Sequence, residues 1–329
     1  MQPSNFIVVT SVFPPTDALR AFARLSEWHM IVVGDQRTPP EWALDGVTYL
    51  SPSAQTALGF ETTNLLPWNH YARKMVGYLY AMREGAQVIA DTDDDNIPKD
   101  NWACPKFEGE FDVITGSGFV NVYRRFTDAF VWPRGYPLRL LRAEEAVTAV
   151  RPQIVEIGVW QFLADADPDV DAVYRLVFDG PITFAERAPL VLDHGVVCPF
   201  NSQNTVFARD AFPLLYLPAF VNFRFTDILR SLVAQPVLWE HGLRLAFGSA
   251  TVRQERNPHD YLKDFADEIP MYLQAEGAFD AAVAATSAEA SIAQNLSAAY
   301  GRLEESGIVE SRERLLLDAW LNDVARATA

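Results

Sequence analysis

The chain of 329 residues carries 43 acidic and 27 basic side chains, a formal net charge of -16 with a pI ≈ 4.7. Because this charge repels polyanions, it argues against general binding to nucleic acid or to an anionic membrane, although a local basic pocket for a phosphate remains compatible with it. Hydrophobic residues make up 49% and charged residues 21%, which is the balance of a globular protein rather than of a disordered one.

The two cysteines, Cys104 and Cys198, have no metal-binding spacing, and two thiols cannot form a disulfide framework. We expect free thiols, as is typical of a reducing compartment. The first six residues contain no basic or apolar signal region, and no run approaches the ~20 apolar residues of a membrane-spanning helix. The sequence therefore predicts a cytoplasmic protein without a transmembrane segment, which could still sit on a membrane through a partner.

Two apolar runs near the start of the chain predict neighbouring strands. The first, 6–11, ends in small polar residues, and the second, 28–35, ends in Gly34 and Asp35. A helix over 18–26, capped by Thr16 or Asp17, lies between them and completes a right-handed βαβ unit. Two such strand ends form a cradle for a nucleotide, where Asp35 could accept from a base or a ribose. The alternative is a simple Gly-Asp turn.

A helix is predicted over 69–84, because apolar residues recur there at helical spacing and Gly85 follows. Arg73 and Lys74 lie in its first turns, where cations oppose the helix dipole. An anionic ligand near the helix start would explain this pair, and a solvated basic pair is the alternative. The preceding segment, 58–68, is expected to be irregular.

Four carboxylates follow a short buried strand, Val88 to Ala90, within five positions: Asp91, Asp93, Asp94 and Asp95. Like charges packed at a strand end cost energy unless a counter-charge offsets them. Mg²⁺ and Mn²⁺ prefer carboxylate oxygens, and a cation held in this way keeps positions open for phosphate oxygens. The pattern predicts a metal–diphosphate site at a strand's carboxyl end, with a solvated acidic turn as the alternative. Asn96 and Pro98 are expected to end regular structure.

The second half of the sequence is expected to supply the acceptor side. The aromatic and Arg-rich segment 121–141 is interpreted as a substrate-side loop, 169–176 as a helical turn, and 196–207 as a polar stretch of amide side chains that suit sugar hydroxyls. Asp227 falls in the first turn of a helix that begins near 226, where it could be a cap or a base. From about 262 the pattern is helical, so we expect a domain over 1–265 and a helical extension over 266–329.

Several of these segments together resemble the STELLO-type (DUF288) glycosyltransferase-like family, in order from about Phe6 to about Phe265. The segments that carry the resemblance are 7–10 with 13–16, 32–35, 67–74 with 77–81, 93–96, 132–137, 169–176, 199–205, 227–230, and Gln254 with 256, 257 and His259. The triple Asp at 93–95 also resembles that of the reversibly glycosylated polypeptides, which act as UDP-arabinopyranose mutases.

The resemblance implies an α/β, GT-A-like fold, in which a Rossmann-type mixed sheet flanked by helices holds a nucleotide sugar through a DXD metal motif. The C-terminal helices, which lie beyond the resemblance, would form an extension that could pack on the core, form a homo-oligomer or dock to a partner. By similarity, Asp95 would ligate Mn²⁺ or Mg²⁺, while Asp93 and Asp94 would lie among the groups that contact the nucleotide sugar. Many GT-A enzymes add a distal His to the metal, for which His259 is the candidate.

The same resemblance implies roles for residues outside the triple Asp. Thr10 and Asp35 match positions that hold the nucleoside, and Arg73 and Lys74 match positions that would meet the diphosphate. Glycosyl transfer builds negative charge on the leaving diphosphate, which a cation and these side chains would stabilise. An inverting enzyme also needs a carboxylate to take the acceptor's proton, and Asp227 would be that base. A retaining enzyme would not need it.

The function that we predict is a metal-dependent glycosyltransferase that uses a nucleotide-diphosphate sugar, most simply a UDP-sugar, and a glycan or other hydroxyl acceptor. A nucleotide-sugar mutase, which needs no separate acceptor, is one alternative. A non-catalytic interaction protein is another, because plant relatives are associated with a larger synthase. The intact Asp cluster and the aromatic segment 121–141 favour the transferase. The sequence determines neither the sugar nor the acceptor, the linkage nor the stereochemistry.

Overall fold

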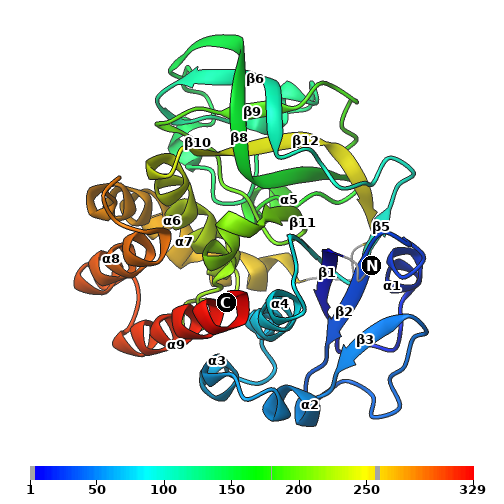
Figure 1. Ribbon diagram of the computed structural model, residues 1–329. Helices are drawn as coiled ribbons and strands as arrows, with labels where there is room; N and C mark the ends of the chain where they lie inside the picture. Colours follow the sequence, from blue (N-terminus) through cyan, green and yellow to red (C-terminus); the bar gives the residue numbers. More distant parts are fainter. Residues whose placement is uncertain (1–3, 179, 256–259) are drawn as a thin grey trace.

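A large mixed sheet organises the fold, which a computed structural model describes for residues 4–178, 180–255 and 260–329 (Figure 1). Its strand order is β3-β2-β1-β4-β11-β8-β6-β9-β12-β5, and β7 and β10 form a separate pair. The strands are β1 Asn5–Thr10, β2 His29–Val33, β3 Val47–Leu50, β4 Val88–Thr92, β5 Asn96–Pro98, β6 Glu108–Gly116, β7 Gly118–Phe119, β8 Val147–Asp165, β9 Leu190–Leu192, β10 Val196–Val197, β11 Asn204–Ala208 and β12 Leu243–Gln254.

Nine α-helices lie in the described part of the chain. They are α1 Asp17–Phe22, α2 Pro52–Ala57, α3 Glu61–Leu65, α4 Lys74–Arg83, α5 Ala172–Val177, α6 Thr226–Glu240, α7 Tyr261–Ala285, α8 Ile292–Glu305 and α9 Ser311–Thr328. Short 3₁₀ helices cover Tyr71–Arg73, Val122–Arg125, Leu138–Leu140 and Arg209–Leu215. Within the described residues, none of these helices has both the length and the apolar character needed to cross a membrane.

The N-terminal half is a parallel βαβ arrangement, as the sequence predicts. Strand β1 pairs in parallel with β2 and β4, and β2 pairs in parallel with β3. Thr16 caps α1 by accepting from the backbone N–H of Leu19 at 3.2 Å. Helix α4 packs directly on β1 and β2 at Gly77, where any Cβ would lie 2.5 Å from a methyl group of Val8. This close approach brings the start of α4 to the carboxyl end of β4.

The C-terminal half adds both antiparallel and parallel strand pairs and closes part of the sheet on itself. Strand β11 runs antiparallel to both β4 and β8. The long strand β8 pairs along its first part with β6 and along its second part with β12, while β9 joins β6 to β12. Four strands, β6, β9, β12 and β8, thus form a closed unit, which stands at the top of Figure 1. The mixed α/β sheet flanked by helices is therefore confirmed.

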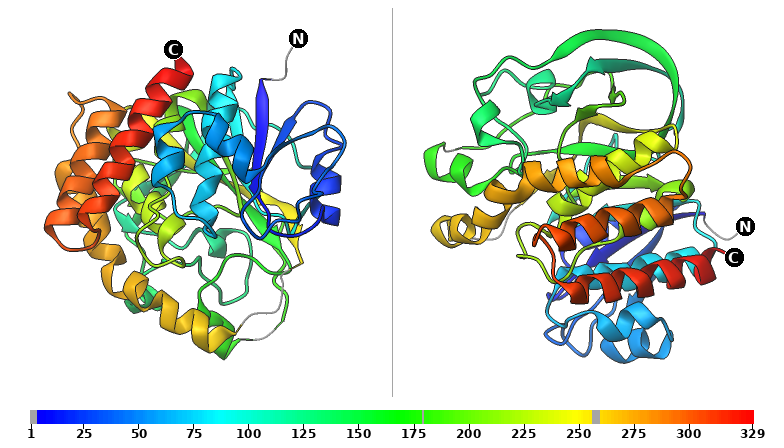
Figure 2. Two further views of the ribbon diagram at one scale, coloured as in Figure 1. Left: turned by 90° about the horizontal axis from the view of Figure 1, so that it is seen from below. Right: turned by 90° about the vertical axis from the view of Figure 1, so that its left-hand side faces the viewer.

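The C-terminal helices pack on the sheet domain. Helices α7, α8 and α9 lie side by side (Figure 2), with α7 against α6 and α9 against α4. Helix α7 runs through the boundary predicted near Phe265. One hydrophobic cluster contains side chains from both sides of that position, such as Val8 and Trp320. Any division of function between 1–265 and 266–329, and any oligomer formed through these helices, stays a prediction.

Two segments differ from the sequence-based expectation, and a third is more buried than its sequence indicates. The segment 58–68, expected to be irregular, contains the short helix α3. Asn96 and Pro98 lie in the short strand β5, which pairs with β12 at the sheet edge, where a proline is tolerated. The segment 121–141 is irregular apart from two short 3₁₀ helices, as predicted for a loop, but it is packed against the core because large aromatic rings gain most when they are buried. Its buried aromatic side chains are Tyr123, Phe126, Trp132 and Tyr136.

Candidate active site

A cavity of ≈ 250 Å³ opens between the turn that follows β4 and the start of α6. Thr10 ends β1 and reaches the same cavity, so the cavity lies at the carboxyl ends of parallel strands, where open α/β sheets bind ligands. The described residues that line it are Thr10, Tyr71, Asp93, Asp94, Asp95, Arg134, Asp169, Ser202, Gln203, Phe223, Arg224, Asp227 and Gln254.

A buried ion network centred on Asp91 lies next to the cavity and includes one of its lining residues, Asp93. Lys74 Nζ lies 2.8 Å from one oxygen of Asp91 and 2.9 Å from Asp93 Oδ1, while Arg230 Nη1 lies 3.0 Å from the other oxygen of Asp91. Burial alone would lower the pKa of Lys74, but Asp91 and Asp93 outweigh it and raise that pKa above its ordinary value. Lys74 is therefore a buried cation that fixes Asp93 to the sheet, and the interpretation of a solvated basic pair is wrong.

The three consecutive aspartates at 93–95, which we call the Asp93–Asp95 cluster, form one wall of the cavity. Removal from bulk water raises the pKa of Asp93 to about 6, which Lys74 partly opposes and the neighbouring charge of Asp95 increases. Burial also raises the pKa of Asp94, which accepts from Ser11 Oγ at 2.5 Å. Asp95 accepts from Gln254 Nε2 at 3.1 Å and 3.2 Å. Ser11 and Gln254 thus help to orient Asp94 and Asp95.

The chemistry of this cluster suits a hard divalent cation, because Mg²⁺ and Mn²⁺ prefer carboxylate oxygens. Within the described residues, however, no three His, Cys, Asp or Glu side chains converge closely enough to hold a metal on their own. A cation bound by Asp95 would therefore need further oxygen ligands, which the diphosphate of a substrate can provide. The predicted ligand His259 lies outside the described residues.

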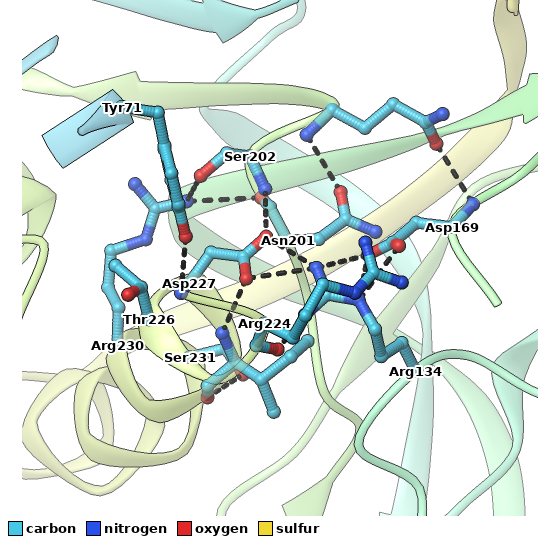
Figure 3. Close-up of polar contacts among 12 residues, drawn as sticks. Tyr71, Arg134, Asp169, Asn201, Ser202, Arg224, Thr226, Asp227, Arg230 and Ser231 are labelled. Carbon is cyan, nitrogen blue, oxygen red and sulfur yellow. Dashed lines mark hydrogen bonds and ion pairs between the residues drawn. The ribbon is translucent and has the colours of Figure 1, made fainter. Parts of the chain in front are cut away.

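The opposite wall contains one arginine that holds two carboxylates, a group that we call the Arg134 clamp (Arg134, Asp169 and Asp227; Figure 3). Arg134 Nε donates to Asp169 at 2.9 Å, and Arg134 Nη2 donates to Asp169 at 2.9 Å and to Asp227 at 2.8 Å. All three side chains are largely buried. Burial would lower the pKa of Arg134, but Asp169 and Asp227 outweigh this and raise it well above its ordinary value.

Local backbone geometry places this clamp. Asp227 lies in the first turn of α6, as predicted, and its backbone N–H donates to the Tyr71 hydroxyl at 3.1 Å. Gly135, next to Arg134, has φ +85°, and any Cβ there would lie 2.4 Å from Ile228 Cγ2. Only glycine fits this position, so the segment around Arg134 can approach the start of α6 closely. The clamp thus depends on contacts between positions about 90 residues apart in sequence.

Two predicted nucleotide-binding residues have other partners. Arg73 does not reach the cavity, because its guanidinium donates to Gln55 Oε1 at 2.8 Å and lies 3.5 Å from the Trp68 ring. Burial lowers the pKa of Arg73 to about 10. Asp35 accepts from three backbone N–H groups, those of Gln36, Asn69 and His70, so it ties the end of β2 to the segment before α4.

A second cavity of ≈ 180 Å³ adjoins the first and shares Thr10, Tyr71, Asp94 and Phe223 with it. Asp35 and His70 also line it. The rings of His70 and Tyr71 are stacked, and the Phe223 ring meets both edge-on. Burial lowers the pKa of His70 to about 4, so its imidazole is neutral near pH 7. This cavity offers flat, uncharged surfaces next to Thr10 and Asp35, as a nucleoside site requires.

Sequence reasoning missed the central role of Arg134 and the buried pairing of Arg230 with Asp91. Arg134 and Arg230 each occur within a longer motif of the sequence, and the spacing of residues in these motifs does not indicate which carboxylates they contact. The amides of 196–207 also have other partners than those expected. Gln203 lines the cavity but bonds to Gln254 and to the backbone N–H of Asp169, and Asn201 bonds to the backbone N–H of Gln203.

Comparisons with known proteins agree with the motif resemblance. A family described as STELLO glycosyltransferases matches residues 224–327. "Probable glycosyltransferase STELLO1" of Arabidopsis thaliana is 30% identical over 350 aligned positions, which cover 98% of this chain and 44% of the relative. "Probable glycosyltransferase STELLO2" of the same plant is 32% identical and covers 82% of this chain and 38% of the relative. The chain thus spans less than half the length of these relatives.

Solved structures give more distant matches. Glucosyl-3-phosphoglycerate synthase from Mycobacterium tuberculosis, crystallised with phosphoglyceric acid, matches 84% of this chain and 81% of its own with a TM-score of 0.40 and 10% identity. A structure of the same enzyme with Mn²⁺ and UDP-glucose matches with a TM-score of 0.39 and 10% identity.

Proposed function

Because the chain belongs to the STELLO-type glycosyltransferase family, we propose that it transfers a sugar from a nucleoside-diphosphate donor, most simply a UDP-sugar, to a hydroxyl of a glycan or another acceptor. The observation that supports this most is the Asp93–Asp95 cluster, which faces a cavity that adjoins a second, aromatic-lined cavity. One cavity suits a diphosphate and its sugar, and the other suits a nucleoside.

The donor would bind across both cavities. The nucleoside would lie against His70, Tyr71 and Phe223, near Thr10, while the diphosphate would face the Asp93–Asp95 cluster. Asp35 would support this site by holding the loop, since its oxygens accept from backbone N–H groups. Arg73 would likewise act from a distance, through the packing of the segment that precedes α4.

A divalent cation, Mn²⁺ or Mg²⁺, would be held by Asp95, with His259 as a second candidate ligand. When bound, it would neutralise negative charge on the leaving diphosphate. Lys74 holds Asp93 in place, and Ser11 and Gln254 orient Asp94 and Asp95. These contacts keep the three carboxylates aimed at the cavity before any donor enters, so that little reorganisation is needed on binding.

A donor screen tests this proposal. The purified chain would be incubated with UDP-, GDP- and CDP-sugars, with Mn²⁺ or Mg²⁺, and the released nucleoside diphosphate measured with and without a mixture of glycan acceptors. We expect release with one nucleotide class, and more release when an acceptor is present. Isomerised donor without released diphosphate would indicate a mutase instead. No change in any donor would indicate a non-catalytic protein.

A further inference from the structure

The imidazole ring of His70 has a defined arrangement of donor and acceptor. His70 caps the 3₁₀ helix Tyr71–Arg73, and its Nδ1 accepts from the Ala72 backbone N–H at 3.1 Å. Because a backbone N–H only donates, Nδ1 carries no proton. Burial lowers the pKa of His70 to about 4, which keeps the ring neutral near pH 7. A neutral imidazole has a single N–H, which therefore lies on Nε2.

Two neighbouring rings hold this imidazole at the aromatic-lined cavity of ≈ 180 Å³. The Tyr71 ring stacks with the His70 ring at a centroid distance of 5.4 Å, and the Phe223 ring meets His70 edge-on at 5.3 Å. All three residues line the cavity. Within the described residues, the Nε2–H of His70 has no acceptor, and Nε2 is not enclosed by the protein. The cavity thus contains a hydrogen-bond donor that is oriented before a ligand binds.

Asp35 supplies an acceptor to the same cavity. Its Oδ1 accepts from the backbone N–H groups of Gln36 and Asn69, at 2.6 Å and 2.9 Å. Its Oδ2 accepts from the His70 backbone N–H at 3.3 Å. These contacts use three different hydrogens, and a carboxylate has about four lone-pair sites, so Oδ2 has room for one further donor. A ligand in this cavity therefore meets a donor at His70 and an acceptor at Asp35.

Nucleobases differ in the edge that they present to such a pair. Uracil has a ring N–H between two carbonyl oxygens, and guanine has a ring N–H beside one carbonyl oxygen. Cytosine has an unprotonated ring nitrogen beside an amino group, so its donor and acceptor are exchanged. Against cytosine, the N–H of His70 would face another N–H and Asp35 would face a lone pair. Each mismatch would leave a polar group unpaired, which weakens binding.

We propose that His70 selects the base of the donor nucleotide, because its Nε2–H donates to a carbonyl oxygen of uracil while Asp35 accepts the neighbouring ring N–H; this inference rests on the proposed function. Guanine presents the same pair of groups on a larger ring system, and the test distinguishes the two bases. His70 thus has two tasks, the cap through Nδ1 and base recognition through Nε2, and each can be removed separately.

The first test compares UDP, CDP and GDP on the wild-type chain by calorimetry in the presence of Mn²⁺. We expect UDP to bind at least about tenfold more tightly than CDP. Binding of CDP as tight as that of UDP would overturn base selection by His70 and leave the glycosyltransferase proposal intact. GDP bound more tightly than UDP would overturn uracil as the selected base. Absence of binding for all three nucleotides would overturn both proposals.

Two variants separate the ring nitrogens of His70. Asparagine places an acceptor oxygen near the position of Nδ1 and keeps the cap, but it is too short to place a donor near that of Nε2. Glutamine places its amide NH₂ near the position of Nε2 and loses the cap. We expect His70→Asn to lower the ratio of UDP affinity to CDP affinity by at least about fivefold. His70→Gln should keep this ratio within about twofold, although both nucleotides bind more weakly.

The ratio of affinities isolates base recognition from a purely structural role. Loss of the cap, or of ring stacking, would weaken UDP and CDP together and leave their ratio unchanged. An unchanged ratio in His70→Asn would therefore overturn the proposal. The comparison of nucleotides on the wild-type chain stands even if either variant fails to fold.

Discussion

The two walls of the cavity hold carboxylates in opposite ways. In the Asp93–Asp95 cluster, Asp94 accepts from Ser11 Oγ and Asp95 accepts from Gln254 Nε2, while Asp93 pairs with Lys74 and its side chain is 41% exposed. In the Arg134 clamp, both carboxylates share a buried guanidinium, and the Asp227 side chain is only 7% exposed. The first wall thus keeps an exposed carboxylate at the cavity, whereas both carboxylates of the second wall are largely buried against one guanidinium. The number of acidic residues on a wall therefore does not indicate which wall faces a ligand.

The largest effect on stability should come from substitution of Lys74, the buried lysine that pairs with Asp93 of the first wall. Lys74→Met would leave Asp91 with Arg230 alone and Asp93 without a cation. Breaking a buried ion pair costs about 3–5 kcal/mol, so we expect a decrease of that size in the free energy of unfolding, measured by urea denaturation. The exposed Arg83→Met on the same helix serves as the control and should change the transition little. Equal effects of the two variants would contradict the buried network.

Substitution of Asp95 in the first wall should strongly weaken the binding of metal and nucleotide. We expect Asp95→Ala to weaken Mn²⁺-dependent binding of UDP by about 100-fold, or about 2.7 kcal/mol, with the fold unchanged, as measured by calorimetry and circular dichroism. The exposed Asp100→Ala, on the loop after β5, should bind as the wild type does. If Asp95→Ala keeps its metal-dependent affinity, Asp95 is not the ligand of the cation.

The stability of the second wall should depend on the planar shape of the Arg134 guanidinium as well as on its positive charge. Lysine has a single nitrogen and cannot make the several parallel contacts of a planar guanidinium, so Arg134→Lys should lower the free energy of unfolding by about 2 kcal/mol. The matched control is Arg139→Lys, whose exposed pair with Glu276 should matter little. A wild-type unfolding midpoint for Arg134→Lys would show that a simple positive charge is sufficient there.

A smaller effect on stability, which depends on pH, is expected at Asp171. Burial raises the pKa of this carboxyl from 3.8 to about 7, and the negative charge of Glu268 adds to the increase. Hydrogen bonds from Tyr174 and Trp132 and the positive charge of Arg134 oppose it. The folded protein therefore binds the proton more tightly than the unfolded chain. This contribution to stability is complete below about pH 3.8 and is lost as the pH rises through about 7, with a slope of at most about 1.4 kcal/mol per pH unit.

Asp171→Asn keeps the cap on α5 and removes this proton. We expect its free energy of unfolding to fall less between pH 5.5 and 8 than that of the wild type, measured by urea denaturation at each pH. Asp280→Asn, on the exposed side of α7, should keep the wild-type slope. An unchanged slope in Asp171→Asn would mean that another group carries the pH dependence.

The first wall could be predicted from sequence, whereas the second could not. Val88 to Ala90 and the carboxylates after them are adjacent in the chain, so hydrophobic pattern and turn residues place them at a strand end. Thr16 as a cap and Asp227 in the first turn of a helix are local features too. The Arg134 clamp joins positions 134, 169 and 227, and its geometry depends on the tertiary packing at Gly135.

The same distinction explains the residues whose surroundings were misjudged. Arg73 and Lys74 are adjacent, but Arg73 ends the 3₁₀ helix Tyr71–Arg73 and contacts Gln55, whereas Lys74 begins α4 and pairs with Asp91. Both are fully buried. The sequence of the aromatic and Arg-rich segment 121–141 predicts a substrate-side loop. In the structure its aromatic rings are buried in the core. Among the described residues that line the cavity, Arg134 is the one that this segment contributes.

The most direct test of the glycosyltransferase proposal is a calorimetric titration of UDP, GDP and CDP into the purified wild-type chain, with and without Mn²⁺. The account predicts that one of these nucleotides, UDP first, binds tightly only when the metal is present. Absence of binding for all three, with and without Mn²⁺, would contradict the assignment of the Asp93–Asp95 cluster as a metal–diphosphate site.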